Sequence, residues 1–464
     1  MPADKKSLSR CWFRPMSEQD YLMGIEPYLD WFDLKHPETP FMQSAHVVPE
    51  KGDKNWASLQ KLFMGLPEKT SSSPTSSAFF DTPDEITFLE PGDAAIALFQ
   101  QATNGFSLGG VGYSVGLKGS MPLTTLIVSD NLRKSVWCNV LSHDFLEAHT
   151  NILDARIAEP TWIKPPHSVV SNECAHHIGL VRGLFWQPAK VKLQWQNGGV
   201  TGFYKEAGTC TVDGFWLHPH TPIDLMRLHG NDPKEKPYLS ARSDQPLWGQ
   251  LLSFFYTDAQ IKAVAVQQQA ASCALVVQQF REVWRTGIKL AVGGYIKGAS
   301  AESLAGRKHE LYSLSTDWQD KSVDLNYLIR LGVGAHRRLA IALEEFADLA
   351  NTILEDRHNG LKKQPKGKEP HFRKNLKLKA KQLYFNNSEA IIHSILKELD
   401  DKDFVACQAA FTNLARVIFD QVVSPYEHDE KMLGPVLTSR NYLNNMLNKL
   451  NQPLPGAADE PLHR

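Results

Sequence analysis

The chain has 464 residues, of which 42% are hydrophobic and 22% are charged. Global disorder is excluded, because this composition supplies enough apolar side chains for a sizeable core, and the length suggests about two or three domains. The formal net charge is −1, so any surface that binds nucleic acid must be local.

Other compositional signals favour a cytoplasmic protein. No apolar run reaches the roughly 18 residues needed to cross a membrane, and the first residues, MPADKKSLSRCWF, contain no hydrophobic segment of a signal peptide. The six cysteines are scattered without a CxxC pair, which is typical of reduced thiols. We therefore expect no membrane contact and no disulfide framework.

The N-terminal part predicts one helix followed by turns and a polar segment. Ser17 to Asp20 form a capping box, which predicts a helix that extends to about Leu34. A low-complexity run, SSSPTSS (71–77), precedes Phe79 and Phe80. These two aromatics are either core residues or exposed rings that stack on unpaired bases. The next segment, 81–93, holds five acids and no base, which argues against broad phosphate contact.

A glycine-rich stretch follows this acidic segment. The pattern predicts a helix over 94–101, a loop with six glycines between Gly105 and Gly119, and a strand over 123–128. Such a loop loses much entropy when it orders. Either close contact with a partner compensates for this loss, or the loop is a tight bend packed against a neighbour.

The glycines also approach a nucleotide-binding pattern. Gly110, Gly112 and Gly116 give GxGxxxG, but a dinucleotide site needs a strand before the loop and a helix after it. Here the predicted order is helix, loop, strand. A phosphate loop is excluded because GxxxxGK[ST] is absent.

The middle of the chain is predicted to contain short strands. LVRGLFW, KVKLQW, TGFYKE and CTVDGFW (between 180 and 216) are rich in β-branched and aromatic residues, and NGG and GT turn signals separate them. Trp186, Trp195 and Trp216 are expected in the core. Several possible zinc ligands occur here: Cys174, His176, His177, Cys210, His218 and His220. Their spacing is atypical of a structural zinc site, and we expect no metal and a polar strand end at His218-Pro219-His220.

The remaining chain predicts a helix, a hairpin and a helical bundle. An apolar-periodic helix is expected over 257–287, followed by a hairpin whose tip is 296–306. From about Ser322, apolar residues with three-to-four spacing predict four helices in an antiparallel bundle. Residues 361–381 contain nine Lys or Arg and one Glu, a local charge of 9 − 1 = +8. This run is either a solvated face or a surface that contacts phosphates.

Several of these motifs occur in the same order in one family. They are AAIALFQQA (94–102), the glycine loop with GLKGSMPLTT (116–125), EPTWIKPP (159–166), GLVRGLFWQP (179–188), GFWLHPHTP (214–222), VGGY (292–295), RKHELY (307–312) and FDQVVSPYEHD (419–429). In these motifs the chain resembles the CasA family, the large subunit of the type I-E CRISPR Cascade complex, from about Ser17 to about Leu450. The family usually carries a further segment ahead of Ser17, and whether this chain is trimmed there or is a short variant stays open.

The resemblance implies a non-enzymatic role without a cofactor. CasA recognises the protospacer-adjacent motif (PAM) in target double-stranded DNA, helps to open the duplex for pairing with the CRISPR RNA, and recruits a helicase-nuclease. By match to the family loop, Gly109, Gly110 and Gly112 are the expected PAM contacts. The minor groove is narrow, so backbone without side chains can approach its floor, and its degenerate code suits a reader that tolerates several motifs.

Other expected contacts follow from the same resemblance. A loop of the family reaches the guide RNA handle and a neighbouring Cascade subunit, and Phe79 and Asp81 match it. In the family, a hairpin at the position of 296–306 carries a glutamine wedge that splits duplex DNA, and a lysine finger is inserted after the HPH segment. Neither the glutamine nor the lysine has a direct equivalent here. Arg227, His229 or Lys234 are candidates for the finger, and Lys297, Ser300 or Glu302 for the wedge. Lys374, Lys377, Lys379 and Lys381 are expected to contact the DNA backbone.

We therefore expect an α+β protein with two parts. Residues 1–320 should form a mixed domain of helices and short antiparallel strands that carries the PAM-recognition loop, and residues 321–464 a C-terminal four-helix bundle. No GxSxG, HExxH or spaced carboxylate cluster indicates catalysis. Two alternatives stay open: a nucleotide-dependent enzyme that uses the glycine loop, and a pure scaffold that never touches DNA.

Overall fold

The computed structural model describes most of the chain. The described residues are 1–48, 56–64, 66, 85–105, 108, 113, 115–119, 121–150, 158–166, 172–208, 211–224, 237–243, 245–257, 259–260, 271–298, 304–357, 371–397 and 404–450. They divide into two compact units. Unit 1 comprises 1–245, 253–259 and 269–311, and unit 2 comprises 246–252, 260–268 and 312–464. Among the described residues, no helix is long and apolar enough to cross a membrane.

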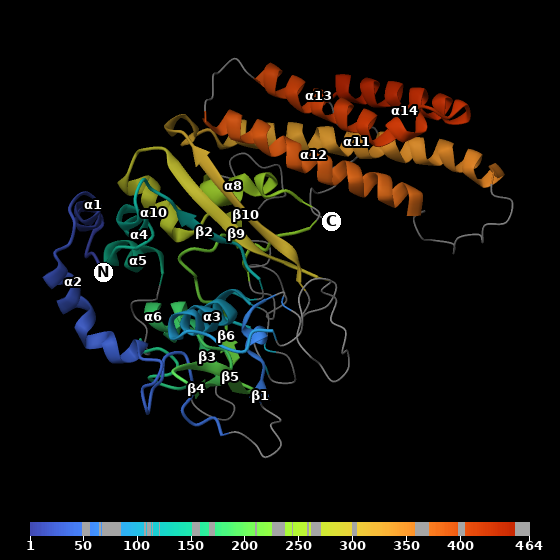
Figure 1. Ribbon diagram of the computed structural model, residues 1–464. Helices are drawn as coiled ribbons and strands as arrows, with labels where there is room; N and C mark the ends of the chain where they lie inside the picture. Colours follow the sequence, from blue (N-terminus) through green and yellow to red (C-terminus); the bar gives the residue numbers. More distant parts are fainter. Residues whose placement is uncertain are drawn as a thin grey trace. The chain divides into compact units, whose positions relative to one another are not determined.

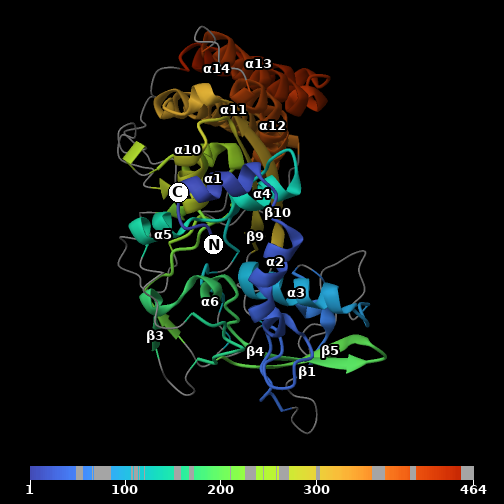
Figure 2. The same cartoon turned by 90° about the vertical axis from the view of Figure 1, so that its left-hand side faces the viewer.

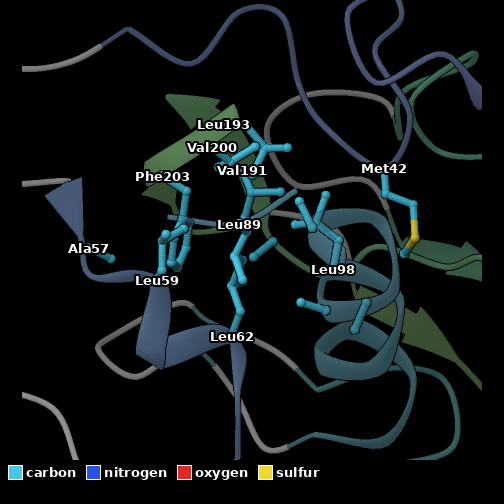
Figure 3. Close-up of a cluster of buried hydrophobic side chains, with 14 of the residues drawn as sticks. Met42, Ala57, Leu59, Leu62, Leu89, Leu98, Val191, Leu193, Val200 and Phe203 are labelled. Carbon is cyan, nitrogen blue, oxygen red and sulfur yellow. The ribbon is translucent and has the colours of Figure 1, made fainter. Parts of the chain in front are cut away.

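One core of unit 1 lies between a small sheet and a helix (Figures 1 and 3). The sheet has the order β1-β5-β4, with both pairs antiparallel, and its strands are β1 (Trp56–Ala57), β4 (Lys190–Gln196) and β5 (Gly199–Glu206). Val191, Leu193 and Phe203 from the sheet pack with Leu98 of helix α3 (Pro91–Asn104). The connection between β4 and β5 is the Asn197-Gly198 turn, in which both residues have positive φ. This is the hairpin geometry that the NGG signal predicts.

A second sheet of unit 1 has the order β10-β9-β2. Strand β2 (Thr124–Ile127) pairs antiparallel with β9 (Ile288–Lys297), and β10 (Leu304–Leu314) is the other neighbour of β9. This confirms the predicted hairpin. Its strands extend into the predicted tip (296–306), because β9 ends at Lys297 and β10 begins at Leu304, and residues 299–303 lie outside the described residues. A Cβ on Gly294 would lie 2.9 Å from the Pro122 carbonyl oxygen, so the VGGY motif lets the chain that enters β2 approach β9 closely.

Two predicted elements of unit 1 are wrong in type. LVRGLFW is not a strand, because Leu180–Leu184 form helix α6. A Cβ on Gly183 would lie 2.1 Å from the Trp216 ring, so this helix fits only with glycine at its contact with the indole. The predicted continuous helix over 257–287 is interrupted by β8 (Ala271–Ser272), which pairs with β7 (Ile223–Asp224), and helix α10 (Leu275–Val283) begins only after it.

The capping box at Ser17 is confirmed, but its helix is shorter than predicted. The Asp20 backbone N–H donates to Ser17 Oγ at 3.1 Å, and α2 (Glu18–Ile25) follows. Pro27 then removes a backbone donor and clashes with the preceding turn. The chain therefore continues as the 3₁₀ helix η1 (Glu26–Phe32) rather than as an α-helix to Leu34.

A buried ion pair holds together two of the family motifs. Arg182 of α6 is fully buried, and its guanidinium donates to both oxygens of the Glu173 carboxylate at 2.6 and 3.2 Å. It also donates to the carbonyl oxygens of Glu159 and Lys164 at 2.9 and 2.8 Å. A single side chain, Arg182, thus connects the motif GLVRGLFWQP to two residues of the motif EPTWIKPP.

Unit 2 consists mainly of long helices, which lie side by side (Figures 1 and 2). They are α11 (Ser322–Arg357), α12 (His371–Lys397), α13 (Phe404–Val423) and α14 (Glu430–Asn448). Arg338 of α11 is buried and donates to the carbonyl oxygens of Met446 and Lys449 at 2.9 and 3.1 Å, so it satisfies the C-terminal end of α14. Together with unit 1, this helical region confirms the predicted α+β class.

The shorter elements complete the described chain. In unit 1 they are α1 (Lys5–Phe13), η2 (Leu59–Leu62), α4 (Leu132–Cys138), α5 (His143–His149), β3 (Asn172–Cys174), η4 (Ala175–His177) and β6 (Thr211–Asp213). The others are η5 (Leu247–Gln250), α8 (Leu251–Phe255), η6 (Thr316–Trp318) and η7 (Ser424–Tyr426).

Candidate nucleic-acid interface

The glycine loop begins and ends against the C-terminal turn of α3. A Cβ on Gly105 would lie 2.5 Å from the Gln101 carbonyl oxygen, and one on Gly116 would lie 2.3 Å from the Ala102 carbonyl oxygen. Gly119 has a φ of +79°, which disfavours any residue with a side chain. At these three positions glycine is required by the fold, as the tight-bend alternative predicts.

Two residues inside the loop are anchored to unit 1. Leu108 is 2% exposed and belongs to the core below the β4–β5 hairpin. Its carbonyl oxygen accepts a hydrogen bond from Lys205 Nζ of β5 at 2.6 Å. The same Nζ lies 4.4 Å from the ring centroid of Tyr113, which packs against that core. Residues 108 and 113 are therefore both held by the β5 strand.

The three glycines proposed for PAM contact, Gly109, Gly110 and Gly112, lie between these anchors but outside the described residues. The same is true of other predicted contacts, namely Phe79, Asp81, Arg227, His229, Lys234, Ser300 and Glu302. Their roles stay predictions. Lys297 is described, and its exposed side chain stands at the end of β9, just before the hairpin tip.

Lys118 is the unexpected residue at this site. It follows the loop and is 4% exposed, although it is a lysine. Its Nζ donates to Asn104 Oδ1 of α3 at 2.7 Å and to Thr124 Oγ1 of β2 at 3.2 Å. Burial lowers the pKa of Lys118 to about 7, and no described carboxylate forms an ion pair with it. This burial was not predictable from the sequence, because a lone lysine among glycines is ordinarily solvated.

The hydrogen bonds of Asn104 extend to the β9–β10 hairpin. Asn104 Nδ2 donates to Gln100 Oε1 at 2.9 Å, and Gln100 Nε2 donates to the Tyr295 hydroxyl of β9 at 3.1 Å. One continuous set of side chains therefore joins the loop exit, the last turn of α3 and the hairpin. We call Tyr295, Gln100, Asn104, Lys118 and Thr124 the Lys118 chain.

The prediction of a polar strand end at His218-Pro219-His220 is wrong, because the segment lies between β6 and β7. It is near Lys118, with His218 buried and His220 half-buried. His218 Nδ1 accepts from the His220 backbone N–H at 3.1 Å, and His220 Nε2 is 2.9 Å from the Asn139 carbonyl oxygen. Burial, with the Lys118 charge as a further cause, lowers the pKa of His220 to about 4 and that of His218 well below its ordinary value. Both imidazoles are thus neutral.

The possible zinc ligands do not converge in the part of the chain that the structure describes. Cys174, His176, His177, His218 and His220 form no group of three whose ligand atoms could share an ion. Cys210 lies outside the described residues. Trp186 and Trp216 are buried as predicted, and Trp195 packs partly buried against the core of the β4–β5 sheet.

The four lysines predicted to contact the DNA backbone do not share one face of α12. At about 100° per residue, Lys377 and Lys381 lie within about 60° of Lys374, whereas Lys379 lies about 140° away from Lys374. Lys374 and Lys379 are exposed. Lys377 is half-buried and forms an ion pair with Glu344 of α11 at 2.6 Å, beside Arg373, which contacts the same carboxylate at 3.1 Å.

Comparison with known proteins decides the family. The family model described as CRISPR-associated protein Cse1 matches residues 1–422. The chain belongs to the Cse1 family. This confirms the predicted membership of the family of Cascade large subunits, also named CasA.

Solved Cse1 structures have the same fold at low sequence identity. Thermobifida fusca Cse1 matches with a TM-score of 0.69 and 15% identity, over 97% of this chain and 88% of that one. Thermus thermophilus CasA matches with a TM-score of 0.68 and 15% identity, over 97% and 87%. A chain of a structure described as a CRISPR RNA-guided surveillance complex matches with a TM-score of 0.59 and 14% identity, over 95% and 85%.

Proposed function

We propose that this Cse1-family chain is the non-catalytic large subunit of a type I-E Cascade complex. In this role it recognises the PAM in target double-stranded DNA, helps to open the duplex for pairing with the CRISPR RNA, and recruits the helicase-nuclease. The observation that carries the proposal is the family match over residues 1–422. Its partners would be the CRISPR RNA, the target DNA, the other Cascade subunits and the helicase-nuclease.

The geometry around the glycine loop supports the PAM-reading part of this role. Leu108 and Tyr113 are anchored on either side of Gly109, Gly110 and Gly112. A reader of the minor groove needs backbone that is presented without side chains from a fixed base, since the groove is only about 6 Å wide. The anchored stems supply that base. The β9–β10 hairpin, which carries the exposed Lys297, belongs to the same unit, and we assign to it the part in duplex opening that the resemblance implies for a hairpin at this position.

The nucleotide-dependent alternative gains no support from the described structure. Helix α3 precedes the loop and strand β2 follows it. A dinucleotide site places the phosphates at the N-terminus of a helix that follows the loop. Here the loop instead follows a helix C-terminus, whose dipole repels phosphates. The following experiment distinguishes the proposed function from the scaffold alternative, in which the chain never touches DNA.

The test is a panel of three kinds of Gly→Asp substitution in the assembled complex. Gly110→Asp and Gly112→Asp are expected to abolish discrimination between matched and scrambled PAM, while assembly with guide RNA stays intact. Gly92→Asp is the matched control, because a Cβ there meets nothing within 4 Å. Gly116→Asp is the folding control, because its Cβ would collide with backbone, and it should lose assembly.

Each outcome of the panel has a definite meaning. Gel filtration reports assembly, and DNA binding with the two PAMs reports recognition. If Gly110→Asp and Gly112→Asp complexes assemble and still discriminate the two DNAs, the loop does not read the PAM. If both variants fail to assemble as Gly116→Asp does, the glycines have a structural role and the scaffold alternative gains.

A further inference from the structure

The Lys118 chain connects three segments that the proposed function uses separately. Lys118 belongs to the exit of the glycine loop, Asn104 and Gln100 to the helix on which both loop stems pack, and Tyr295 to the hairpin strand β9. Thr124 provides a second connection from Lys118 to β9. Its hydroxyl accepts a hydrogen bond from Lys118, and in the β2–β9 ladder it is paired in register with Gly293. All of these residues lie within unit 1.

Holding a loop with a buried ammonium group costs free energy, because the charge loses its hydration. No described acid compensates Lys118, and the groups that face it are the amide of Asn104, the hydroxyl of Thr124 and the two neutral imidazoles of His218 and His220. An apolar side chain of the same length would fill the space without the cost of desolvating a charge. The amine is therefore expected to have a role beyond packing. Its two hydrogen bonds indicate that this role is to connect the loop exit to α3 and β2.

We propose that Lys118 is a positioning residue that couples the glycine loop to the β9–β10 hairpin. The inference rests on the proposed function, in which the loop reads the PAM and the hairpin acts in duplex opening. When DNA engages the loop, any movement of its exit displaces Lys118. The hydrogen bonds through Asn104 and Gln100 pass that displacement to Tyr295, and the β2–β9 pairing passes it to the same strand. PAM binding thereby sets the position of the hairpin that meets the duplex.

The test separates PAM binding from duplex opening in the assembled guide RNA complex. Two kinds of target DNA are compared, one fully paired and one with a pre-opened bubble next to the PAM, and each is prepared with a matched and with a scrambled PAM. Lys118→Met and Tyr295→Phe are each expected to slow formation of the guide–target hybrid on paired DNA about tenfold, the size of a typical coupling between sites. Hybrid formation on bubble DNA should stay within about twofold of wild type, because it needs no coupling. Lys118→Arg, which keeps a cationic donor, should recover part of the loss.

A double variant tests whether Lys118 and Tyr295 act through the same set of hydrogen bonds. If the two residues act through one chain, Lys118→Met combined with Tyr295→Phe should be no slower than either single variant. Tyr295→Phe removes only a hydroxyl, so it keeps the test valid if Lys118→Met folds poorly. Lys190→Met, a half-exposed lysine on β4, is the matched control and should behave as wild type.

Two results would overturn the coupling alone: additive losses in the double variant, or equal losses on paired and bubble DNA in a complex whose wild type discriminates PAMs. A wild-type complex that ignores the PAM on both DNAs would instead overturn the proposed function, and the coupling with it.

Discussion

At the residue scale, burial of Lys118 makes the free energy of unfolding depend on pH. Its pKa is about 7 in the folded chain against an ordinary value of 10.5, so the unfolded chain binds this proton more tightly. The resulting penalty, on the order of 5 kcal/mol, is complete below pH 7 and is relieved as the pH rises toward 10.5. Lys118→Met removes the penalty but leaves Asn104 and Thr124 without their donor.

We therefore predict that the free energy of unfolding of wild type, relative to Lys118→Met, increases between pH 7 and pH 10. Urea unfolding of both proteins across this range measures the difference. Lys190→Met should show no such change relative to wild type, since that lysine is half-exposed. A parallel pH profile for wild type and Lys118→Met would mean that the ammonium is not desolvated.

A second residue-scale prediction concerns the buried ion pair. Arg182→Leu should lower the free energy of unfolding by about 3–5 kcal/mol, because it leaves the Glu173 carboxylate and two carbonyl oxygens buried without a donor. Arg440→Leu is the comparison, since Arg440 pairs with Asp420 and Glu427 at partly exposed positions of unit 2. It should cost about 1 kcal/mol or less. Chemical denaturation measures both, and equal costs would contradict the role given to burial.

At the element scale, the lysines of helix α12 fall into two groups, one that is ion-paired and one that is exposed. Lys377 forms an ion pair with Glu344, which also pairs with Arg373, whereas Lys374 and Lys379 are exposed. Replacing Lys374 and Lys379 together by Gln should weaken DNA binding by the complex equally for all PAMs. It should also reduce the slope of log K against log salt by up to about 0.9 for each lost phosphate contact.

Lys377→Gln is the matched control for this experiment. Its charge is already paired, so its loss should leave the salt slope nearly unchanged. Titrations at several salt concentrations measure the slopes. An unaltered slope for the Lys374 and Lys379 variant would show that these two lysines are merely solvated.

The elements also show what sequence patterns can and cannot predict. The long helices of unit 2 were predictable because their apolar spacing extends over many turns, and the β4–β5 hairpin because Asn197-Gly198 has one favoured turn. Helix α6 was missed because it is short, Leu180–Leu184, and the β-prone Phe185 and Trp186 follow it directly. Its conformation is decided by contacts distant in sequence, between Gly183 and Trp216 and between Arg182 and Glu173. The Lys118 chain was missed for the same reason, since it joins residues from 100 to 295.

At the scale of the whole molecule, the surfaces that we propose to contact nucleic acid belong to both units. Unit 1 contains the glycine loop and the hairpin, and unit 2 contains the exposed lysines of α12. The net charge of the chain is only −1, so there is no general attraction for phosphates. On the proposed function, specific recognition therefore requires the guide RNA and the other subunits in addition to these small local surfaces.

The most direct test of the account compares DNA binding by the isolated chain and by the complex that it forms with guide RNA and the other Cascade subunits. Binding is measured at one salt concentration with duplexes that carry matched or scrambled PAMs. We predict that the isolated chain binds both duplexes weakly and alike, and that the complex prefers the matched PAM by at least about tenfold. Sub-nanomolar, sequence-specific binding by the isolated chain, or a complex that binds both duplexes equally, would contradict the account.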